Sequence, residues 1–165
     1  MKNIVLIGMP ACGKSTIGVI LAKQMGMHFI DTDIVIQEQE GRRLQDIIDA
    51  DGVPYLLKAE ERAILSTVCE NSVVATGGSA VFSECSMKHL RTNGVAVYLK
   101  LPYPVIEQRL NNLDSRGVAG AKDMTLKQIY DLRTPLYSRY ADVVIDCEGK
   151  TIEGIAEEIE RSVQR

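Results

Sequence analysis

The stretch that decides the fold is residues 4–16, IVLIGMPACGKST. It begins with a short β-branched run and continues into the pattern G-x-x-x-x-G-K-[ST], in which backbone N–H groups cradle phosphate oxygens. Residues 14–26 follow with apolar side chains at helical spacing, and Gly26 is typical of a helix end. A strand, a glycine-rich loop and a helix in this order predict a nucleotide phosphate site.

Each residue type in this loop has a chemical reason to be there. The glycines let the backbone curl inward, the lysine is expected to reach the terminal phosphates, and the serine hydroxyl is placed to bind Mg²⁺. The residues expected to contact the nucleotide are Gly8, Ala11, Cys12, Gly13, Lys14, Ser15 and Thr16. A chance glycine-rich turn is the alternative, and the flanking strand and helix disfavour it.

Beyond the loop, apolar strand-like runs alternate with helix-like stretches. Continuous apolar strands separated by helices predict a parallel sheet that is covered on both faces. We therefore expect a three-layer α/β/α fold with five parallel strands, formed by a single domain over residues 1–165. The expected strands are 4–8, 28–33, 72–78, 95–101 and 142–147. The expected helices are 14–26, 33–41, 44–52, 54–71, 103–112, 125–141 and one from 151 onward.

The composition disfavours several classes of protein. The formal net charge is −3, so a general attraction to nucleic acid or to an anionic membrane is not expected. No apolar run approaches the length of a membrane-spanning helix. The four cysteines include no C-x-x-C pair, which indicates neither a zinc site nor a disulfide framework. We expect a cytoplasmic monomer with reduced thiols and no cleaved leader peptide.

Two carboxylates lie at the end of the second expected strand, where ligands of parallel sheets bind. Asp31 and Asp33 are two residues apart, which would place both side chains on one face of a strand. One would serve the metal shell, for which we favour Asp31, and the other would bind an acceptor hydroxyl. The alternative is that they cap a helix, since Asp33 precedes a helix-like stretch.

A second glycine turn and three arginines complete the candidate residues. The turn TGGS at 76–79 follows the third strand, and its glycines would let a substrate approach the backbone. Arg109, Arg116 and Arg133 are candidates to stabilise the charge of a phosphoryl-transfer transition state. Arg116 lies in the irregular stretch 113–124, where a lid that excludes water is expected. For each arginine, a solvated surface charge is the alternative.

The chain resembles the shikimate kinases, small members of the nucleoside-monophosphate-kinase-like P-loop group. The resemblance covers nearly the whole chain and is carried by GMPACGKSTIG (8–18), FIDTD (29–33), GRRLQDIIDADG (41–52), ATGGSAV (75–81), R…SRG (109–117) and RTPLYSRYAD (133–142). It implies transfer of the γ-phosphate of ATP to the 3-hydroxyl of shikimate, with Mg²⁺ as cofactor. It also implies an acceptor-binding region at about 32–60 and a lid at about 112–124.

The resemblance implies a role for each matching residue. Lys14 and Ser15 would serve ATP and Mg²⁺, and Asp33 would hold the acceptor hydroxyls and receive the proton. The catalytic set would then be Lys14, Asp33 and Arg116. The other implied contacts are Gly77 and Gly78 along the acceptor pocket, Arg133 on the acceptor carboxylate, Arg116 over the phosphates and Arg109 near the adenine.

Three departures from the family pattern fall on the acceptor side. Leu57 stands where the family has an arginine that pairs with the acceptor carboxylate, and leucine offers no charge-assisted hydrogen bond. On its helix, Leu57 would share a face with Ile64 and Val68, so core packing is its alternative role. Ser79 replaces the third glycine of the turn, and Gly117 replaces a lid proline. A different hydroxylated acceptor, or a non-catalytic nucleotide-binding regulatory module, therefore stays open as an alternative.

Overall fold

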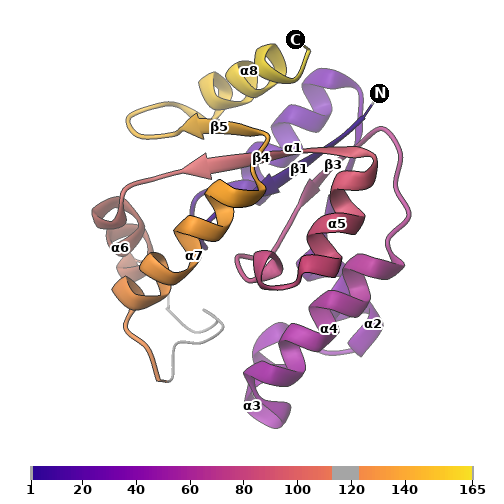
Figure 1. The fold of residues 1–165 in the computed structure, drawn as a ribbon, viewed down its shortest axis with the longest axis vertical. Coiled ribbons are helices and arrows are strands. Elements are labelled where there is room, and N and C mark those ends of the chain that lie inside the picture. Colours follow the sequence, from indigo (N-terminus) through magenta and orange to yellow (C-terminus); the bar gives the residue numbers. More distant parts are fainter. Residues whose placement is uncertain (1, 113–122, 165) are drawn as a thin grey trace.

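The computed structural model describes residues 2–112 and 123–164. At its centre lies a five-stranded sheet in the order β2-β3-β1-β4-β5, in which all neighbouring strands are parallel (Figure 1). The strands are β1 (Asn3–Ile7), β2 (His28–Asp31), β3 (Ser72–Ala75), β4 (Gly94–Lys100) and β5 (Val143–Asp146). The predicted α/β fold with a five-stranded parallel sheet is confirmed.

Helices cover both faces of this sheet. They are α1 (Lys14–Met25), α2 (Thr32–Glu40), α3 (Leu44–Asp51), α4 (Val53–Ser66), α5 (Glu84–Thr92), α6 (Tyr103–Asn112), α7 (Leu126–Tyr140) and α8 (Ile152–Val163), with a short 3-10 helix at Ala80–Phe82. Figure 1 shows α1 and α8 on one side of the sheet and α5 and α7 on the other. The main core therefore forms two layers, one on each face of the strands.

Strand β1 is the centre of the main core. All five of its residues are buried, as expected for a strand between two parallel neighbours and two helical layers. Ile17 and Leu21 of α1 are buried on the helix face that their spacing predicts. The phosphate loop between β1 and α1 is thus fixed at both ends by elements of the main core.

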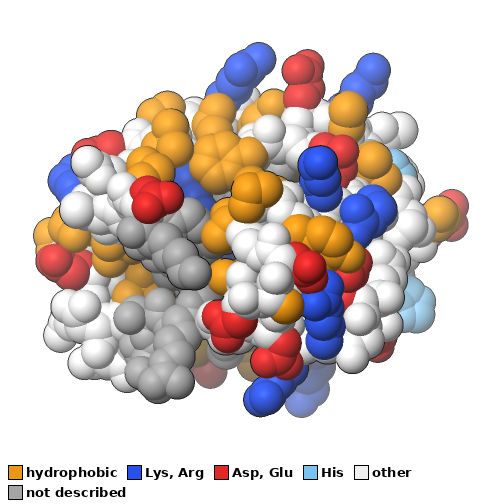
Figure 2. Space-filling view, turned by 90° about the horizontal axis from the view of Figure 1, so that it is seen from below, with side chains coloured by type: hydrophobic (Ala, Val, Ile, Leu, Met, Phe, Trp, Pro, Cys, Tyr) orange, Lys and Arg blue, Asp and Glu red, His pale blue; other side chains and the backbone are white. Residues whose placement is uncertain are grey.

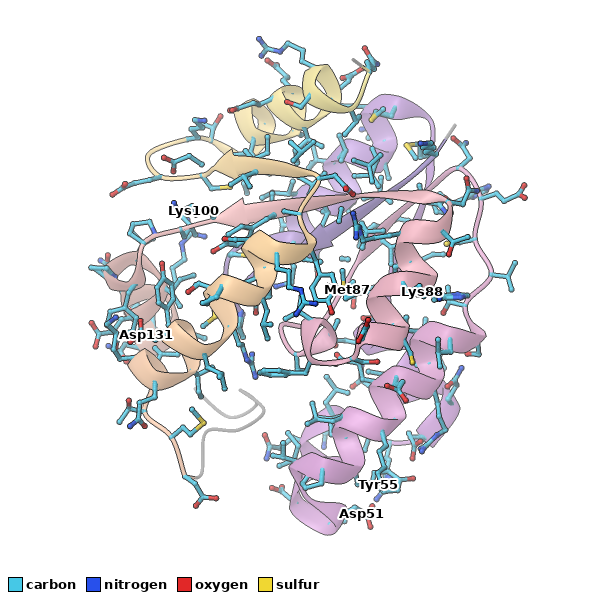
Figure 3. All side chains as sticks on the ribbon, viewed as in Figure 1. Asp51, Tyr55, Met87, Lys88, Lys100 and Asp131 are labelled. Carbon is cyan, nitrogen blue, oxygen red and sulfur yellow. The ribbon has the colours of Figure 1, made fainter. Side chains whose placement is uncertain are left out.

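A second, smaller core lies between α2, α3 and α4. We call these three helices (residues 32–66) the helical unit. The buried residues of this core are Ile36, Ile47, Ile48, Leu56, Ala59 and Ala63. A polar cluster closes its outer end, where Tyr55 donates to Glu40 at 2.7 Å and the guanidinium of Arg42 pairs with Asp51. Figure 3 shows Asp51 and Tyr55 together at this end, away from the sheet.

Several boundaries differ from those expected from the sequence. Helix α4 ends at Ser66 rather than near residue 71, because the hydroxyls of Ser66 and Thr67 both donate to the carbonyl of Ala63 and compete with the helical ladder. Val68 consequently lies beyond the helix and is 91% exposed, so the proposed apolar face through Val68 is wrong. Strand β3 ends at Ala75, before the glycine turn, and α5 was not expected at all.

Candidate active site

The phosphate loop leaves β1 at the carboxyl edge of the sheet. Gly13 has φ 98°, a left-handed conformation that favours glycine, and a Cβ at Gly8 would lie 2.9 Å from the carbonyl oxygen of Leu99. The Nζ of Lys14 donates to the carbonyls of Gly8 and Met9 at 2.8 and 2.9 Å. The loop therefore wraps around a buried cation at the start of α1, as a phosphate-binding loop requires.

The two aspartates come together at the start of a helix, and not along one face of a strand. Strand β2 ends at Asp31, which caps α2 by accepting from the backbone N–H of Asp33 at 2.9 Å. The capping alternative thus holds for Asp31, whereas Asp33 already lies in α2. The second oxygen of Asp31 accepts from the hydroxyl of Ser15 at 2.6 Å. One carboxylate therefore joins the helix cap to the phosphate loop.

Asp33 points its carboxyl group into a cavity beside the loop. Burial is the main cause that raises its pKa above the ordinary value for an aspartate, and the neighbouring charge of Asp31 raises it further. The ammonium group of Lys14 acts in the opposite direction and favours the ionised form. The raised pKa makes Asp33 a better proton acceptor than a fully solvated aspartate.

The second glycine turn is fixed by close approach to its neighbours. The hydroxyl of Thr76 donates to the carbonyl of Leu6 at 2.9 Å and ties the turn to β1. A Cβ at Gly77 would lie 2.3 Å from Oε2 of Glu60, which no side chain could tolerate without a shift. A Cβ at Gly78 would lie 2.9 Å from a ring carbon of Pro10. A larger residue at either position would have to displace these neighbours, because the turn is packed closely against the site.

Helix α7 brings a cation to this turn. Arg133 is 2% exposed, and its guanidinium lies over the ring of Phe82 at 5.4 Å. One of its Nη atoms lies so close to Gly78 that a Cβ there would be 2.9 Å away. One helical turn further on, the hydroxyl of Tyr137 donates to the carbonyl of Gly78. These contacts fix a buried positive charge beside the glycine turn.

The loop, the turn, α7 and the helical unit line a cavity of about 290 Å³ that is open to solvent. One wall comes from the phosphate loop and the start of α1, and it is lined by Pro10, Ala11, Gly13, Lys14, Ser15 and Thr16. The other walls come from the helical unit, the glycine turn and α7, and they are lined by Asp33, Ile36, Leu44, Leu56, Glu60, Thr76, Gly77, Gly78, Ser79 and Arg133. Residues far apart in the sequence therefore meet in one space that a small molecule could fill.

Some candidate residues do not line this cavity. Arg109 is exposed on α6, but its guanidinium donates to the carbonyl of Ala11 at 3.0 Å and so lies beside the loop. Cys12 is buried within the loop, with its sulfur 3.7 Å from the Nζ of Lys14. Arg116, Gly117 and most of the expected lid lie outside the described residues.

Leu57 is half-buried on α4, and its neighbour Leu56 lines the cavity instead. Leu56 and Glu60 are one helical turn apart, so they share the face of α4 that looks into the cavity. Neither of them was predicted from the sequence to be a site residue. An acidic residue within the apolar stripe of Leu56, Ala59 and Ala63 was the signal that could have found Glu60.

Glu60 is the buried carboxyl group on the helical side of the cavity. It is 5% exposed, and its Oε1 accepts from the hydroxyl of Ser79 at 2.9 Å. Burial raises the pKa of Glu60 to about 7, and the charge of Asp33 adds to this rise. The bond from Ser79 and the charges of Arg133 and Lys14 lower its pKa and limit the effect.

A comparison with known proteins identifies the family of this chain. The family model for shikimate kinase matches residues 10–164. The chain belongs to the shikimate kinase family. It is 35% identical to the shikimate kinase of Caldanaerobacter subterraneus subsp. tengcongensis over 98% of this chain and 96% of that protein. It is 36% identical to the shikimate kinase of Thermodesulfovibrio yellowstonii over 100% of this chain and 96% of that protein.

Solved structures agree with this assignment. The structure of shikimate kinase from Acinetobacter baumannii in complex with shikimate matches with a TM-score of 0.89 and 26% identity, covering 99% of this chain and 93% of that one. A gluconokinase from Sinorhizobium meliloti matches with a TM-score of 0.58 and 17% identity, which shows the fold alone. The prediction of a shikimate-kinase-like phosphotransferase that uses ATP and an alcohol acceptor is confirmed. Within residues 2–112 and 123–164, no helix combines the length and the apolar character needed to cross a membrane.

Proposed function

We propose that this family member transfers the γ-phosphate of ATP to the 3-hydroxyl of shikimate, producing ADP and shikimate 3-phosphate. The observation that carries the proposal is the composition of the cavity, where the phosphate loop faces Asp33 on one side and Arg133 on another. A donor phosphate, a hydroxyl and a carboxylate would each meet a group of suitable chemistry within this space. The full-length similarity to shikimate kinases supports the same acceptor.

On the donor side, the loop backbone binds the phosphates and Lys14 neutralises their charge. The loop residues in this role are Gly8, Ala11, Cys12, Gly13, Lys14, Ser15 and Thr16. Arg109 lies beside the adenine, which its contact with the carbonyl of Ala11 supports. Arg116 lies outside the described residues, and we assign it a contact with the phosphates by resemblance to the family. The reaction needs little covalent chemistry from the protein, because positioning and charge compensation supply most of the acceleration.

The residues beside the loop fit a magnesium ion. Ser15 and Asp31 present a hydroxyl and a carboxylate 2.6 Å apart, and oxygen atoms of this kind are the ligands that Mg²⁺ prefers. The cap bond from the backbone of Asp33 fixes the orientation of Asp31. When bound, Mg²⁺ neutralises charge on the transferring phosphate. We assign Ser15 and Asp31 as the protein groups that hold it.

On the acceptor side, Asp33 orients the hydroxyl and takes its proton, as its raised pKa favours. Arg133 binds the carboxylate, and the backbone of Gly77 and Gly78 lets the ring approach the turn. Ser79 stands at the end of this turn. The apolar side chains of Ile36, Leu44 and Leu56 contact the carbon ring. Leu57 lies next to this wall on α4.

We further propose that the chain works as a single-domain cytoplasmic monomer with an acceptor-binding region at about 32–60 and a lid at about 112–124. Figure 2 shows acidic and basic side chains interspersed on the face seen from below, without a continuous basic stripe. This distribution and the net charge of −3 support small-molecule substrates over nucleic acid.

The test is a measurement of ADP release with ATP, Mg²⁺ and a panel of acceptors containing shikimate, quinate, gluconate and nucleoside monophosphates. We expect strong turnover with shikimate. Lys14→Ala should lower that turnover by roughly 100- to 1000-fold, because a charge that stabilises the transition state is lost. Lys23→Ala, at an exposed position on the same helix, should retain it.

A second candidate is phosphorylation of a different hydroxylated acceptor, which Leu57 favours because it supplies no positive charge near the carboxylate. Turnover with another member of the panel and none with shikimate would assign this function instead. Full activity of Lys14→Ala would overturn the assignment of the phosphate loop.

A further inference from the structure

Glu60 lines the cavity, yet the reaction proposed above gives it no role. Its carboxyl group is held on two sides, since Oε1 accepts from Ser79 at 2.9 Å and Oε2 lies against the backbone of Gly77. The hydrogen bond and the close packing hold the carboxyl group inside the cavity, where Glu60 is 5% exposed. The position of the carboxyl group is therefore fixed in the site, and its charge, when it is ionised, acts on whatever binds there.

The charge of Glu60 decides the net charge of the described side chains that line the cavity. Among the described residues that line it, the charged groups are Lys14 on α1, Asp33 on α2, Glu60 on α4 and Arg133 on α7. All of the other three act on the Glu60 carboxyl. With Glu60 ionised, two positive charges meet two negative ones. With Glu60 protonated, two positive charges meet one negative charge, and the cavity favours an anion.

Burial is the main cause of the raised pKa of Glu60, and its neighbour Leu57 supplies no charge to offset it. Leu57 precedes Glu60 by three residues on α4, a spacing at which helical side chains are neighbours, and it contributes no charge. Apart from the hydroxyl of Ser79, compensation comes from Arg133 and Lys14, which also serve the substrates. Burial raises the pKa of Glu60 to about 7, so its charge changes near neutral pH.

We propose that Glu60 is a specificity-determining residue whose proton controls the affinity of the site for an acceptor carboxylate. When Glu60 is protonated, it does not compete with the acceptor carboxylate for the positive charge of Arg133. When Glu60 is ionised, the two carboxylates compete for that charge. Binding of the carboxylate therefore takes up a proton at Glu60. This inference rests on the proposed function, because it takes shikimate as the carboxylated acceptor.

The direction of the effect follows from the linkage between proton and acceptor binding. Glu60 is mostly protonated below pH 7, so the affinity for shikimate is highest there and falls as the pH rises through about 7. One linked proton limits the change to tenfold per pH unit. Between pH 6 and pH 8 we expect the KM for shikimate to rise by up to about tenfold.

The experiment compares the pH dependence of KM for two acceptors and two enzymes at saturating Mg²⁺-ATP. The wild type should show the rise with shikimate and a flat profile with the methyl ester of shikimate, which has no carboxylate. Glu60→Gln should show a flat profile with both. The same rise in Glu60→Gln, or with the ester, would overturn the inference.

A second variant keeps the test valid even if Glu60→Gln folds poorly. Ser79→Ala removes a hydrogen bond that favours the ionised form of Glu60, so the rise in KM should move to higher pH. An unmoved rise would contradict the proposal. Calorimetry of wild type with shikimate in two buffers of different ionisation enthalpy should show net proton uptake near pH 7.5, and absence of uptake would also overturn it.

The role of Glu60 and the proposed function can be told apart by experiment. Shikimate turnover with a KM that does not depend on pH would overturn this inference and leave the proposed function intact. Absence of shikimate turnover at every pH would overturn both.

Discussion

Arg133 is the residue that we propose binds the acceptor carboxylate, and it is buried beside the glycine turn. Truncating one partner of a buried, hydrogen-bonded charge pair typically costs about 2–5 kcal/mol. We expect Arg133→Ala to raise the KM for shikimate on the order of 100-fold, which corresponds to about 3 kcal/mol. Arg133→Lys should recover part of the loss, because it keeps the charge without the planar fork.

The methyl ester of shikimate serves as the control for Arg133. Its KM should change little in Arg133→Ala, since it has no carboxylate to lose a partner. An equal loss for the ester and for shikimate would mean that the arginine supports the glycine turn and does not bind the acceptor carboxylate.

Leu57 tests whether the neighbouring face of α4 can contact the acceptor. Leu57→Arg should lower the KM for shikimate by roughly tenfold, because a guanidinium added beside Leu56 can form charge-assisted hydrogen bonds with the carboxylate. Leu57→Met is the matched control, with similar volume and no charge. Steady-state kinetics that show no gain for Leu57→Arg would mean that this position does not reach the acceptor.

The buried carboxyl of Glu60 also affects folding. Its pKa of about 7 in the folded state exceeds the value of 4.5 for an ordinary glutamate, so the folded state holds this proton more tightly than the unfolded state. The contribution of Glu60 to the free energy of unfolding is therefore present at low pH and is lost between about pH 4.5 and 7. The loss amounts to about 3 kcal/mol.

Urea denaturation across this pH range measures the effect. The free energy of unfolding of wild type relative to Glu60→Gln should fall as the pH rises from 4.5 to 7 and then level off. The exposed Glu38→Gln should follow the wild type throughout. A constant difference between wild type and Glu60→Gln would show that the carboxyl does not titrate in this range.

At the scale of elements, α1 depends on a glycine to pack against β2. A Cβ at Gly18 would lie 2.6 Å from the ring of Phe29, closer than side chains approach without a shift. Alanine would favour the helix by about 1 kcal/mol over glycine, but overpacking typically costs 1–3 kcal/mol. We expect Gly18→Ala to destabilise the protein by about 1 kcal/mol in thermal or urea unfolding.

A double variant separates the clash from other effects of Gly18→Ala. Adding Phe29→Leu to it should cost less than Phe29→Leu costs in the wild type, because the smaller side chain makes room for the new methyl group. Purely additive losses would show that the ring already has space to move.

Elements whose apolar side chains repeat at a regular spacing could be predicted from the sequence. The face of α1 with Ile17 and Leu21 and the buried run of β1 are examples. Helix α5 was missed because its buried residues, among them Met87 and Leu90, are few among polar neighbours. The end of α4 was misplaced because side-chain hydroxyls, which periodicity does not register, stop the helix.

The site residues, too, include some that the sequence predicts and some that it does not. Lys14 and Ser15 follow from a motif, because a phosphate loop fixes its own geometry locally. No motif predicts Leu56 and Glu60. The rotation of α4 against α2, α3 and the glycine turn decides which of its residues face the cavity. That rotation is set by tertiary packing and has no local signature in the sequence.

At the scale of the whole molecule, the two cores differ in size and in what they support. The main core holds the sheet and the phosphate loop, whereas the separate hydrophobic core of the helical unit has six buried residues. Local opening costs less where fewer apolar contacts are broken. We expect backbone amides of α2, α3 and α4 to exchange with deuterium faster than those of β1, β3 and β4.

Hydrogen exchange followed by mass spectrometry tests this difference. Shikimate should slow exchange in the helical unit more than in the sheet, because it would bind against Ile36, Leu44 and Leu56. Uniform protection across both parts, with and without shikimate, would show that the protein opens as one cooperative unit.

The separate core of the helical unit has a consequence for how such an enzyme can change. Residues 32–66 carry Asp33, Leu44, Leu56 and Glu60 on one small, separately packed piece, while the machinery for ATP is anchored elsewhere. Substitutions at Leu44, Leu56 or Glu60 can therefore reshape this wall of the cavity while the phosphate loop, which is anchored in the main core, stays unchanged. A different acceptor could be accommodated in this way, provided that Asp33 is kept.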